Sequence, residues 1–289
     1  MENTEKNKVL PSTLYLVATP IGNLSDISER AKKVLSEVDF IAAEDTRNSI
    51  KLLSAFGIKK ELISYFEHNK KTSGERIVAR LLRGESCALV TDAGMPAISD
   101  PGEDIVRMCS DAGITVAIVP GACAAVSALA LSALSTSRFA FEGFLPANKS
   151  ERRKRLDGVK NEERTMIFYE APHKLTATLA DMAEVFGENR KISLCRELTK
   201  LNEDVMRTTL GKACEYYKEN SPRGEYVLVL EGAIEAGCSL FSENALNSLT
   251  PREHVEKYIA EGMSKMDAIK KTSKDRGVPK SEIYDLMID

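Results

Sequence analysis

The sequence predicts an α/β protein, with two α/β domains followed by a small C-terminal helical segment. Three observations lead to this class. Short apolar runs alternate with amphipathic stretches between residues 13 and 121, and the same alternation resumes from Phe139 to Gly232. From Thr250 onward the pattern is helical. The expected domains are residues 12–121, 122–234 and 245–289, with residues 233–245 as a linker.

In the first domain, short apolar runs are expected to form the strands Leu14–Ala18, Phe40–Ala43, Leu62–Tyr65, Ala88–Thr91 and Thr115–Val119. Amphipathic helices are expected between them, at Ile27–Val38 and Ser73–Arg83. Asp26 and Glu29 are expected to form a cap-like pair at the start of the first helix. Because short apolar strands that alternate with helices are buried on both faces, this pattern predicts a parallel sheet.

The second domain is predicted to contain the strands Phe139–Phe144, Thr165–Tyr169, Ile192–Cys195, Val205–Leu210 and Tyr226–Leu230. The last run is almost continuously apolar, so we expect it to be a central strand of a mixed sheet. A basic helix that contains Glu151–Arg155 is predicted between Ser150 and Glu163.

The C-terminal segment has the spacing of a helix-turn-helix. A helix is predicted to start at Pro251, Gly277 is expected to supply the turn, and Val278 is expected to pack inward before a last helix at Lys280–Tyr284. Two interpretations stay open, a nucleic-acid-binding element and a three-helix cap without such a role.

The composition excludes several function classes. Charged residues make up 29% and hydrophobic residues 43% of the chain, and the net charge of −3 indicates no global attraction to nucleic acid or membranes. The six cysteines contain no C-x-x-C pair, so no metal site is expected. Neither a signal peptide nor an apolar run long enough to cross a bilayer is visible. We therefore expect a cytoplasmic protein with reduced thiols and no membrane association.

The loop Val90–Gly102 is rich in residues that shape the backbone. It follows the strand-like run Cys87–Val90 and contains two prolines, two glycines and two aspartates. A loop at the carboxyl end of a strand is where an α/β protein holds a small ligand, although a structural turn would have the same composition. The sequence lacks a G-x-G-x-x-G motif after a strand and any G-x-x-x-x-G-K-[ST] motif. The loop therefore favours a cofactor without a pyrophosphate.

Further polar or glycine-containing segments follow the other strands of the first domain: Thr19–Asn23, Glu44–Arg47 and Pro120–Cys123. Strand ends on one edge of one sheet converge, so these segments and the loop after Val90 predict a single ligand crevice. The helix Ala122–Ser135 is rich in Ala and Ser, which allows close approach either to a ligand or to the sheet.

Seven segments resemble, in order, the motifs of one family: Leu16–Leu24, Ala43–Arg47, Val90–Gly102, Val119–Ala122, Phe168–Lys174, Arg196–Lys200 and Arg223–Val227. The chain resembles the tetrapyrrole methylase family (class III S-adenosylmethionine methyltransferases), in particular its bacterial branch that acts on small-subunit ribosomal RNA. The resemblance covers about residues 12–232, and the C-terminal helices match the appendage of that branch. It implies two α/β domains with the cofactor cleft between them.

The resemblance also implies the activity. It is the transfer of a methyl group from S-adenosyl-L-methionine to the ribose 2′-hydroxyl of a cytidine in the decoding region of 16S rRNA, in the 30S subunit. Family members are usually homodimers. Matched by motif, the residues implied to bind the cofactor are Pro20, Ile21, Gly22, Asp92, Ala93, Gly94, Ala97, Cys123, Ala124 and Tyr169.

Methyl transfer from a sulfonium mainly requires alignment, and a general base would assist a ribose hydroxyl. Glu170 is the first candidate, because it ends a strand that should face the cofactor, although it could instead bind the cofactor. Asp45 is the second, although it could form a structural ion pair with Arg47. The remaining polar candidates at cleft positions are Glu44, His173, Arg196, Glu197 and Lys200.

RNA must be held by contacts to its phosphates. The candidate patch on the basic helix consists of Lys149, Arg152, Arg153, Lys154 and Arg155, although such a run can also be a solvated helix face. Two other functions stay open. The first is a methylase of the same fold that acts on a small tetrapyrrole-like substrate, and the second is a non-enzymatic nucleic-acid-binding regulator.

Overall fold

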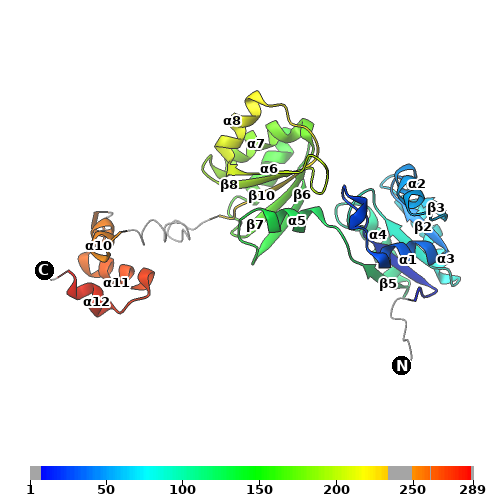
Figure 1. Ribbon diagram of the computed structural model, residues 1–289, viewed down its shortest axis with the longest axis horizontal. Helices are drawn as coiled ribbons and strands as arrows, with labels where there is room; N and C mark the ends of the chain where they lie inside the picture. Colours follow the sequence, from blue (N-terminus) through cyan, green and yellow to red (C-terminus); the bar gives the residue numbers. More distant parts are fainter. Residues whose placement is uncertain (1–7, 234–248, 261, 288–289) are drawn as a thin grey trace. The chain divides into compact units, whose positions relative to one another are not determined.

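The computed structural model describes residues 8–233, 249–260 and 262–287. These residues form two compact units that divide after Gly232. The first unit holds two five-stranded sheets with their helices, and the second unit is helical (Figure 1). The predicted α/β class with C-terminal helices is confirmed. Most of the predicted linker lies outside the described residues, as does Cys238.

The first sheet is parallel throughout, with the strand order β3-β2-β4-β1-β5. Its strands are β1 (Thr13–Val17), β2 (Phe40–Ala43), β3 (Glu61–Ser64), β4 (Cys87–Val90) and β5 (Thr115–Val119). Helices alternate with them: α1 (Glu29–Glu37), α2 (Thr46–Ala55), α3 (Lys70–Leu82) and α4 (Gly102–Asp111). Successive side chains of β1 enter different cores, Leu14 one and Tyr15 the other, so both faces of the sheet are covered.

The start of α1 differs from the prediction. The N-cap is Ser28, whose hydroxyl accepts the N–H of Ala31 at 3.1 Å. Asp26 belongs to a preceding 3₁₀ turn, η1 (Leu24–Asp26), and Glu29 pairs instead with Lys32 at 2.6 Å. The short turn moves the helix start past Asp26, so the expected cap-like pair does not form.

The second sheet is mixed, as predicted, with the order β6-β7-β10-β8-β9 and a single parallel pair, β6 with β7. Its strands are β6 (Phe139–Phe144), β7 (Thr165–Glu170), β8 (Lys191–Arg196), β9 (Asp204–Thr209) and β10 (Tyr226–Leu230). The fully buried β10 is central. One face packs against α6 (Lys149–Gly158), α7 (Pro172–Phe186) and α8 (Leu210–Glu219), and the other against α5 (Ala124–Leu131).

The second unit consists of α10 (Pro251–Ala260), α11 (Lys265–Arg276) and α12 (Lys280–Asp285). Gly277 ends α11 in the left-handed conformation, with a φ of 63°, and Val278 packs against the small core of this unit, as predicted. No helix among the described residues is long and apolar enough to cross a membrane. The described residues also contain no cluster of side chains suited to a metal ion.

Candidate active site

Two loops at the carboxyl edge of the first sheet are joined by backbone hydrogen bonds. The N–H of Thr19, after β1, donates to the Gly94 carbonyl at 2.9 Å, and the N–H of Gly94, after β4, donates to the Thr19 carbonyl at 3.1 Å. Gly94 has a φ of 85°, and a Cβ there would lie 3.2 Å from Ile21 Cγ2. Only glycine fits this close approach without strain.

The rest of the loop after β4 is held by Asp100. Its Oδ1 accepts the N–H groups of Ala97 at 2.9 Å and Gly102 at 2.7 Å. Ala97 and Ser99 are in the left-handed region, with φ of 67° and 63°, which costs a non-glycine residue of order 1–3 kcal/mol. Asp100 Oδ2 is buried without a hydrogen-bond partner among the described residues. Backbone strain and an open buried acceptor are more typical of a ligand site than of a structural turn.

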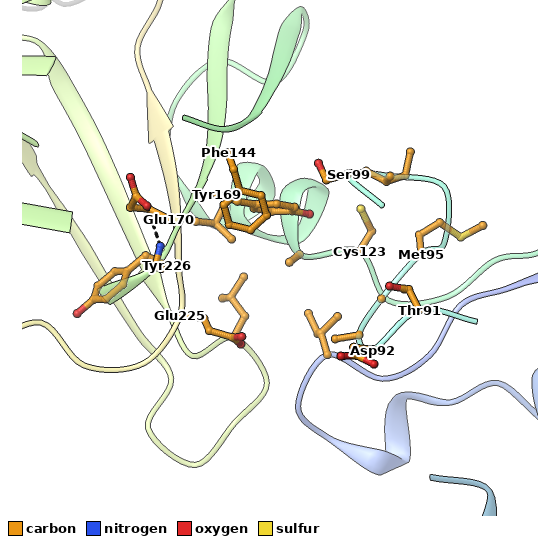
Figure 2. Close-up of a pocket in the computed structure, with 18 of the residues that line it drawn as sticks. Thr91, Asp92, Met95, Ser99, Cys123, Phe144, Tyr169, Glu170, Glu225 and Tyr226 are labelled. Carbon is orange, nitrogen blue, oxygen red and sulfur yellow. Dashed lines mark hydrogen bonds between the residues drawn. The ribbon is translucent and has the colours of Figure 1, made fainter. Parts of the chain in front are cut away.

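This loop forms one wall of a cavity of about 490 Å³, a volume in the usual range for small-molecule sites. Figure 2 shows Thr91, Asp92, Met95 and Ser99 on one side and Phe144, Tyr169 and Glu225 on the other. The strand ends of both sheets therefore contribute to the same pocket.

Carboxylates dominate the charge of the pocket. Among the described residues, its lining contains Glu44, Asp92, Asp100, Glu170, Glu197 and Glu225 but a single cationic side chain, Lys200. The Nζ of Lys200 donates to Glu197 at 2.9 Å and to Glu225 at 2.7 Å. Burial, and then the neighbouring Glu44, raises the pKa of Asp92. The pocket therefore favours a positively charged ligand over a phosphate.

The pocket brings together most of the residues singled out from the sequence: Ile21, Asp92, Ala93, Gly94, Cys123, Ala124, Tyr169 and Glu170. Three of the expected cofactor-binding residues do not line it. Pro20 is buried, Ala97 is bonded to Asp100, and Gly22 lies against the loop after β8, where a Cβ would come within 2.4 Å of Lys200 Cγ.

Sequence reasoning assigned no role to several residues of the lining, among them Asp100, Phe144, Leu198 and Glu225. Three of the four lie inside the strand-end motifs, so position in a motif was a usable signal for them. Phe144 had no such signal, because a phenylalanine at the end of a strand is usually part of a core.

The sequence and the fold have counterparts among known proteins. The sequence profile of the tetrapyrrole (corrin/porphyrin) methylases matches residues 13–214. The chain belongs to the tetrapyrrole methylase family. Ribosomal RNA small subunit methyltransferase I of Halalkalibacterium halodurans is 50% identical, over 95% of this chain and 94% of that protein. The Bacillus subtilis protein of the same name is 47% identical, over 94% of this chain and 92% of that protein.

Solved structures of low sequence identity share the fold. A uroporphyrin-III-C-methyltransferase from Thermus thermophilus is 18% identical with a TM-score of 0.55, covering 75% of this chain and 94% of that chain. A diphthine synthase is 14% identical with a TM-score of 0.58, covering 76% and 90%. The family membership and the methylase fold expected from the strand-end motifs are thereby confirmed.

In this methylase, Glu170 is 3% exposed and lies just before α7. Its Oε1 accepts the N–H of Ala171 at 2.9 Å, and its Oε2 accepts the hydroxyl of Thr178 at 2.5 Å. Figure 2 shows the Tyr169 hydroxyl directed toward Cys123 and the Glu170 carboxylate directed away from it. Burial, followed by the neighbouring Cys123, raises the pKa of Tyr169 to about 12, so its hydroxyl stays a hydrogen-bond donor. The bonding of Glu170 fits an anchor of the pocket wall better than a free proton acceptor.

Asp45 does not line the pocket. It is the N-cap of α2 and accepts the Arg47 N–H at 2.8 Å and Arg47 Nη2 at 2.7 Å. These hydrogen bonds lower the pKa of Asp45 to about 2, which makes it a weak base near neutral pH. The structure therefore favours the ion-pair alternative for Asp45. His173 is exposed in the first turn of α7, outside the pocket lining.

The basic helix α6 differs from the prediction at Arg152, which is 5% exposed. Its Nη2 lies 2.6 Å from Asp181 Oδ2 on α7, and its Nη1 donates to the Ala147 carbonyl at 3.1 Å. The expectation that Arg152 contacts RNA is corrected, because its guanidinium is buried and binds Asp181 and the Ala147 carbonyl inside the protein.

The other cations of α6 lie on or near the surface. Arg153 is paired with Glu184 and Arg155 with Glu142. Lys149 and Lys154 are exposed and have no ion-pair partner among the residues that the structure describes. They are the cations of this helix that are free to meet a phosphate.

Proposed function

We propose that this methylase transfers the methyl group of S-adenosyl-L-methionine to the ribose 2′-hydroxyl of a cytidine in the decoding region of 16S rRNA, within the 30S subunit. The observation that carries the proposal is the acidic pocket lined by strand ends of both sheets, together with the two exposed lysines of α6, a helix that begins five residues after the lining residue Phe144. The names of the 43–50% identical relatives support the small-subunit RNA as substrate.

The residues present fit a cationic methyl donor. When bound, S-adenosyl-L-methionine supplies an activated methyl group on a sulfonium. The buried Asp100 Oδ2, without a hydrogen-bond partner among the described residues, offers an acceptor for a cationic group, and Asp92 adds a second carboxylate. Ala93, Gly94 and Ala124 keep the nearby walls free of bulky side chains. Ile21, Cys123 and Tyr169 complete the proposed contact surface, and Pro20, Gly22 and Ala97 shape the loops behind it.

Alignment is the main task that the protein performs. We assign Glu170 to that task, because its carboxylate ties the end of β7, where Tyr169 lies, to α7. Asp45, whose pKa is held at about 2, is a weak base near neutral pH, so we assign it no proton-accepting role.

Isotope-labelled S-adenosyl-L-methionine offered with 30S subunits, free 16S rRNA or a uroporphyrin-type tetrapyrrole tests the proposal. We expect label in the 30S arm and 2′-O-methylcytidine after nuclease digestion. Label in the tetrapyrrole alone would support the small-molecule alternative. RNA binding without transfer to any acceptor would support the non-enzymatic regulator.

We also propose a cytoplasmic homodimer, since the proposed substrate is ribosomal. Exposed apolar side chains lie on β5, α5 and β6, where the chain crosses from the first sheet to the second: Ile118 is 53%, Val126 53% and Phe139 42% exposed. An apolar surface of this kind is suited to a second copy. Light scattering should give twice the monomer mass for the wild type and a monomer for Val126→Glu. A monomeric wild type would contradict the dimer.

A further inference from the structure

The end of β6 contains a β-bulge that changes the direction of Phe144. Phe141 pairs with Ile167 of β7, but Gly143 pairs with Phe168 and Phe144 with Tyr169, so one residue of β6 is extra. Gly143 adopts a φ of 66°, which favours glycine. The bulge therefore places Phe144 on the same face of the sheet as Tyr169.

Phe144 is open to solvent at the pocket. The side chain is 57% exposed, although its ring lies 5.3 Å from that of Tyr169 and it lines the cavity (Figure 2). A Cβ added to Gly143 would lie 3.3 Å from Ser99 Oγ, so the bulge lies beside the strained loop of the first sheet. The exposed part of the ring is apolar surface that a bound partner can bury.

A short, anchored segment connects Phe144 to the basic helix. Arg152 donates to the carbonyls of Ala147 at 3.1 Å and Pro146 at 3.4 Å while its charge is held by Asp181. Lys149, which starts α6, is exposed and free of ion pairs among the described residues. An aromatic face and a free cation thus lie five positions apart on a segment whose backbone is tied down. An aromatic ring can stack on a nucleotide base, and a cation beside it can bind a phosphate of the same strand.

We propose that Phe144 is the stacking platform for the base of the nucleotide whose ribose enters the pocket, with Lys149 on a neighbouring phosphate. This inference rests on the proposed function and names the substrate subsite beside it. Stacking requires a π-face rather than a particular base, so Phe144 contributes to holding the nucleotide and not to choosing its sequence. The adenine of the methyl donor has the same chemistry, and the experiment separates the two bases.

The test compares Phe144→Ala, Phe144→Leu and Phe144→Trp in the full chain, with Tyr216→Leu as the control. Tyr216, on α8, is an exposed aromatic side chain that does not line the pocket. We expect the KM for 30S subunits to rise about 5- to 100-fold in the Phe144→Ala and Phe144→Leu variants, as for the loss of one stacked base. The Phe144→Trp and Tyr216→Leu variants should stay near the wild type, and all thermal midpoints should be unchanged.

Binding of S-adenosyl-L-methionine, measured by calorimetry, completes the test. An unchanged donor Kd in all variants supports the substrate base as the stacking partner. A donor Kd that weakens in step with the KM would assign the ring to the adenine of the donor and overturn the inference. So would wild-type behaviour of Phe144→Leu. If the wild-type enzyme methylates no RNA, the proposed function itself fails and the inference falls with it.

Discussion

Arg152 reaches the same carboxylate oxygen of Asp181 through two nitrogens, Nη2 at 2.6 Å and Nε at 2.8 Å. Both side chains are almost fully buried, and they join α6 to α7. Because removing one partner leaves the other charged and buried, Asp181→Asn or Arg152→Met should lower the free energy of unfolding by about 3–5 kcal/mol. Urea unfolding measures this loss.

Arg153→Met is the matched control for that measurement. Arg153 pairs with Glu184 at the surface, so its removal should change the unfolding free energy by no more than about 1 kcal/mol. Equal losses for Arg152→Met and Arg153→Met would contradict the buried role of Arg152.

Lys149 and Lys154 should bind the RNA phosphates that reach α6. Replacing both by Glu should weaken RNA binding and flatten its dependence on salt by about 0.7 in logarithmic slope for each phosphate that is no longer neutralised, as for a single strand. Fluorescence anisotropy with an rRNA fragment over a salt series gives the slope. Replacing both Lys212 and Lys218 by Glu, on α8, is the control that changes the net charge by the same amount. If the double variant has the same salt slope as the wild type, α6 does not bind the RNA phosphates.

Glu170 and Thr178 should act as one unit. If the carboxylate anchors α7, Glu170→Gln and Thr178→Val should each cost about 1–3 kcal/mol of stability and lower kcat by similar, small factors. Neither should shift the pH profile of kcat. A proton acceptor behaves differently. In that case Glu170→Gln alone would lose about 10²-fold or more in kcat and Thr178→Val would not.

Gly22 should tolerate no side chain. An added Cβ would lie 2.8 Å from Thr199 Oγ1 and 3.0 Å from the Leu198 carbonyl. Gly22→Ala must therefore push apart the loops after β1 and β8, and we expect donor binding to weaken by about tenfold or more, as for a misplaced binding group. Calorimetry measures the Kd. Gly158→Ala, where a Cβ meets nothing within 4 Å, should bind the donor as the wild type does.

His254 should make the C-terminal unit sensitive to acid. Its Nδ1 accepts Arg276 Nε at 3.0 Å, and burial, followed by the charge of Arg276, lowers its pKa below the ordinary 6.5. The unfolded chain therefore takes up a proton at a higher pH than the folded unit does. The stabilisation is complete above about pH 6.5 and declines as the pH falls toward the folded pKa.

Hydrogen exchange of α10 and α11 at about pH 7.5 and about pH 5.5, corrected for intrinsic rates, measures this loss. The two-sheet unit is the internal control, since its histidines, His68 and His173, are both exposed. His254→Gln, which does not titrate, should abolish the difference between the two pH values. Equal protection of the wild-type helices at both values would contradict the prediction.

Local patterns in the sequence were enough for the strands and for the family. The unbroken apolar run Tyr226–Leu230 is the buried central strand, and Gly277 ends its helix in the left-handed conformation. The loop after β4 lines one pocket with residues that follow other strands, as the common edge of parallel strands predicts. These inferences succeeded because each depends on neighbours within a few residues or on a general property of parallel sheets.

The tertiary structure decided what the individual side chains do. In the sequence Arg152 has the pattern of a surface cation, but in the fold it forms a buried ion pair with Asp181, 29 residues away. Glu170 looks like a free carboxylate until Thr178 bonds to it, and Phe144 looks like a core residue until the bulge at Gly143 turns it toward the pocket. In each case the role depends on a partner from another element or on one extra residue in a strand. Hydrophobic periodicity, which reports only the burial of a face, does not contain that information.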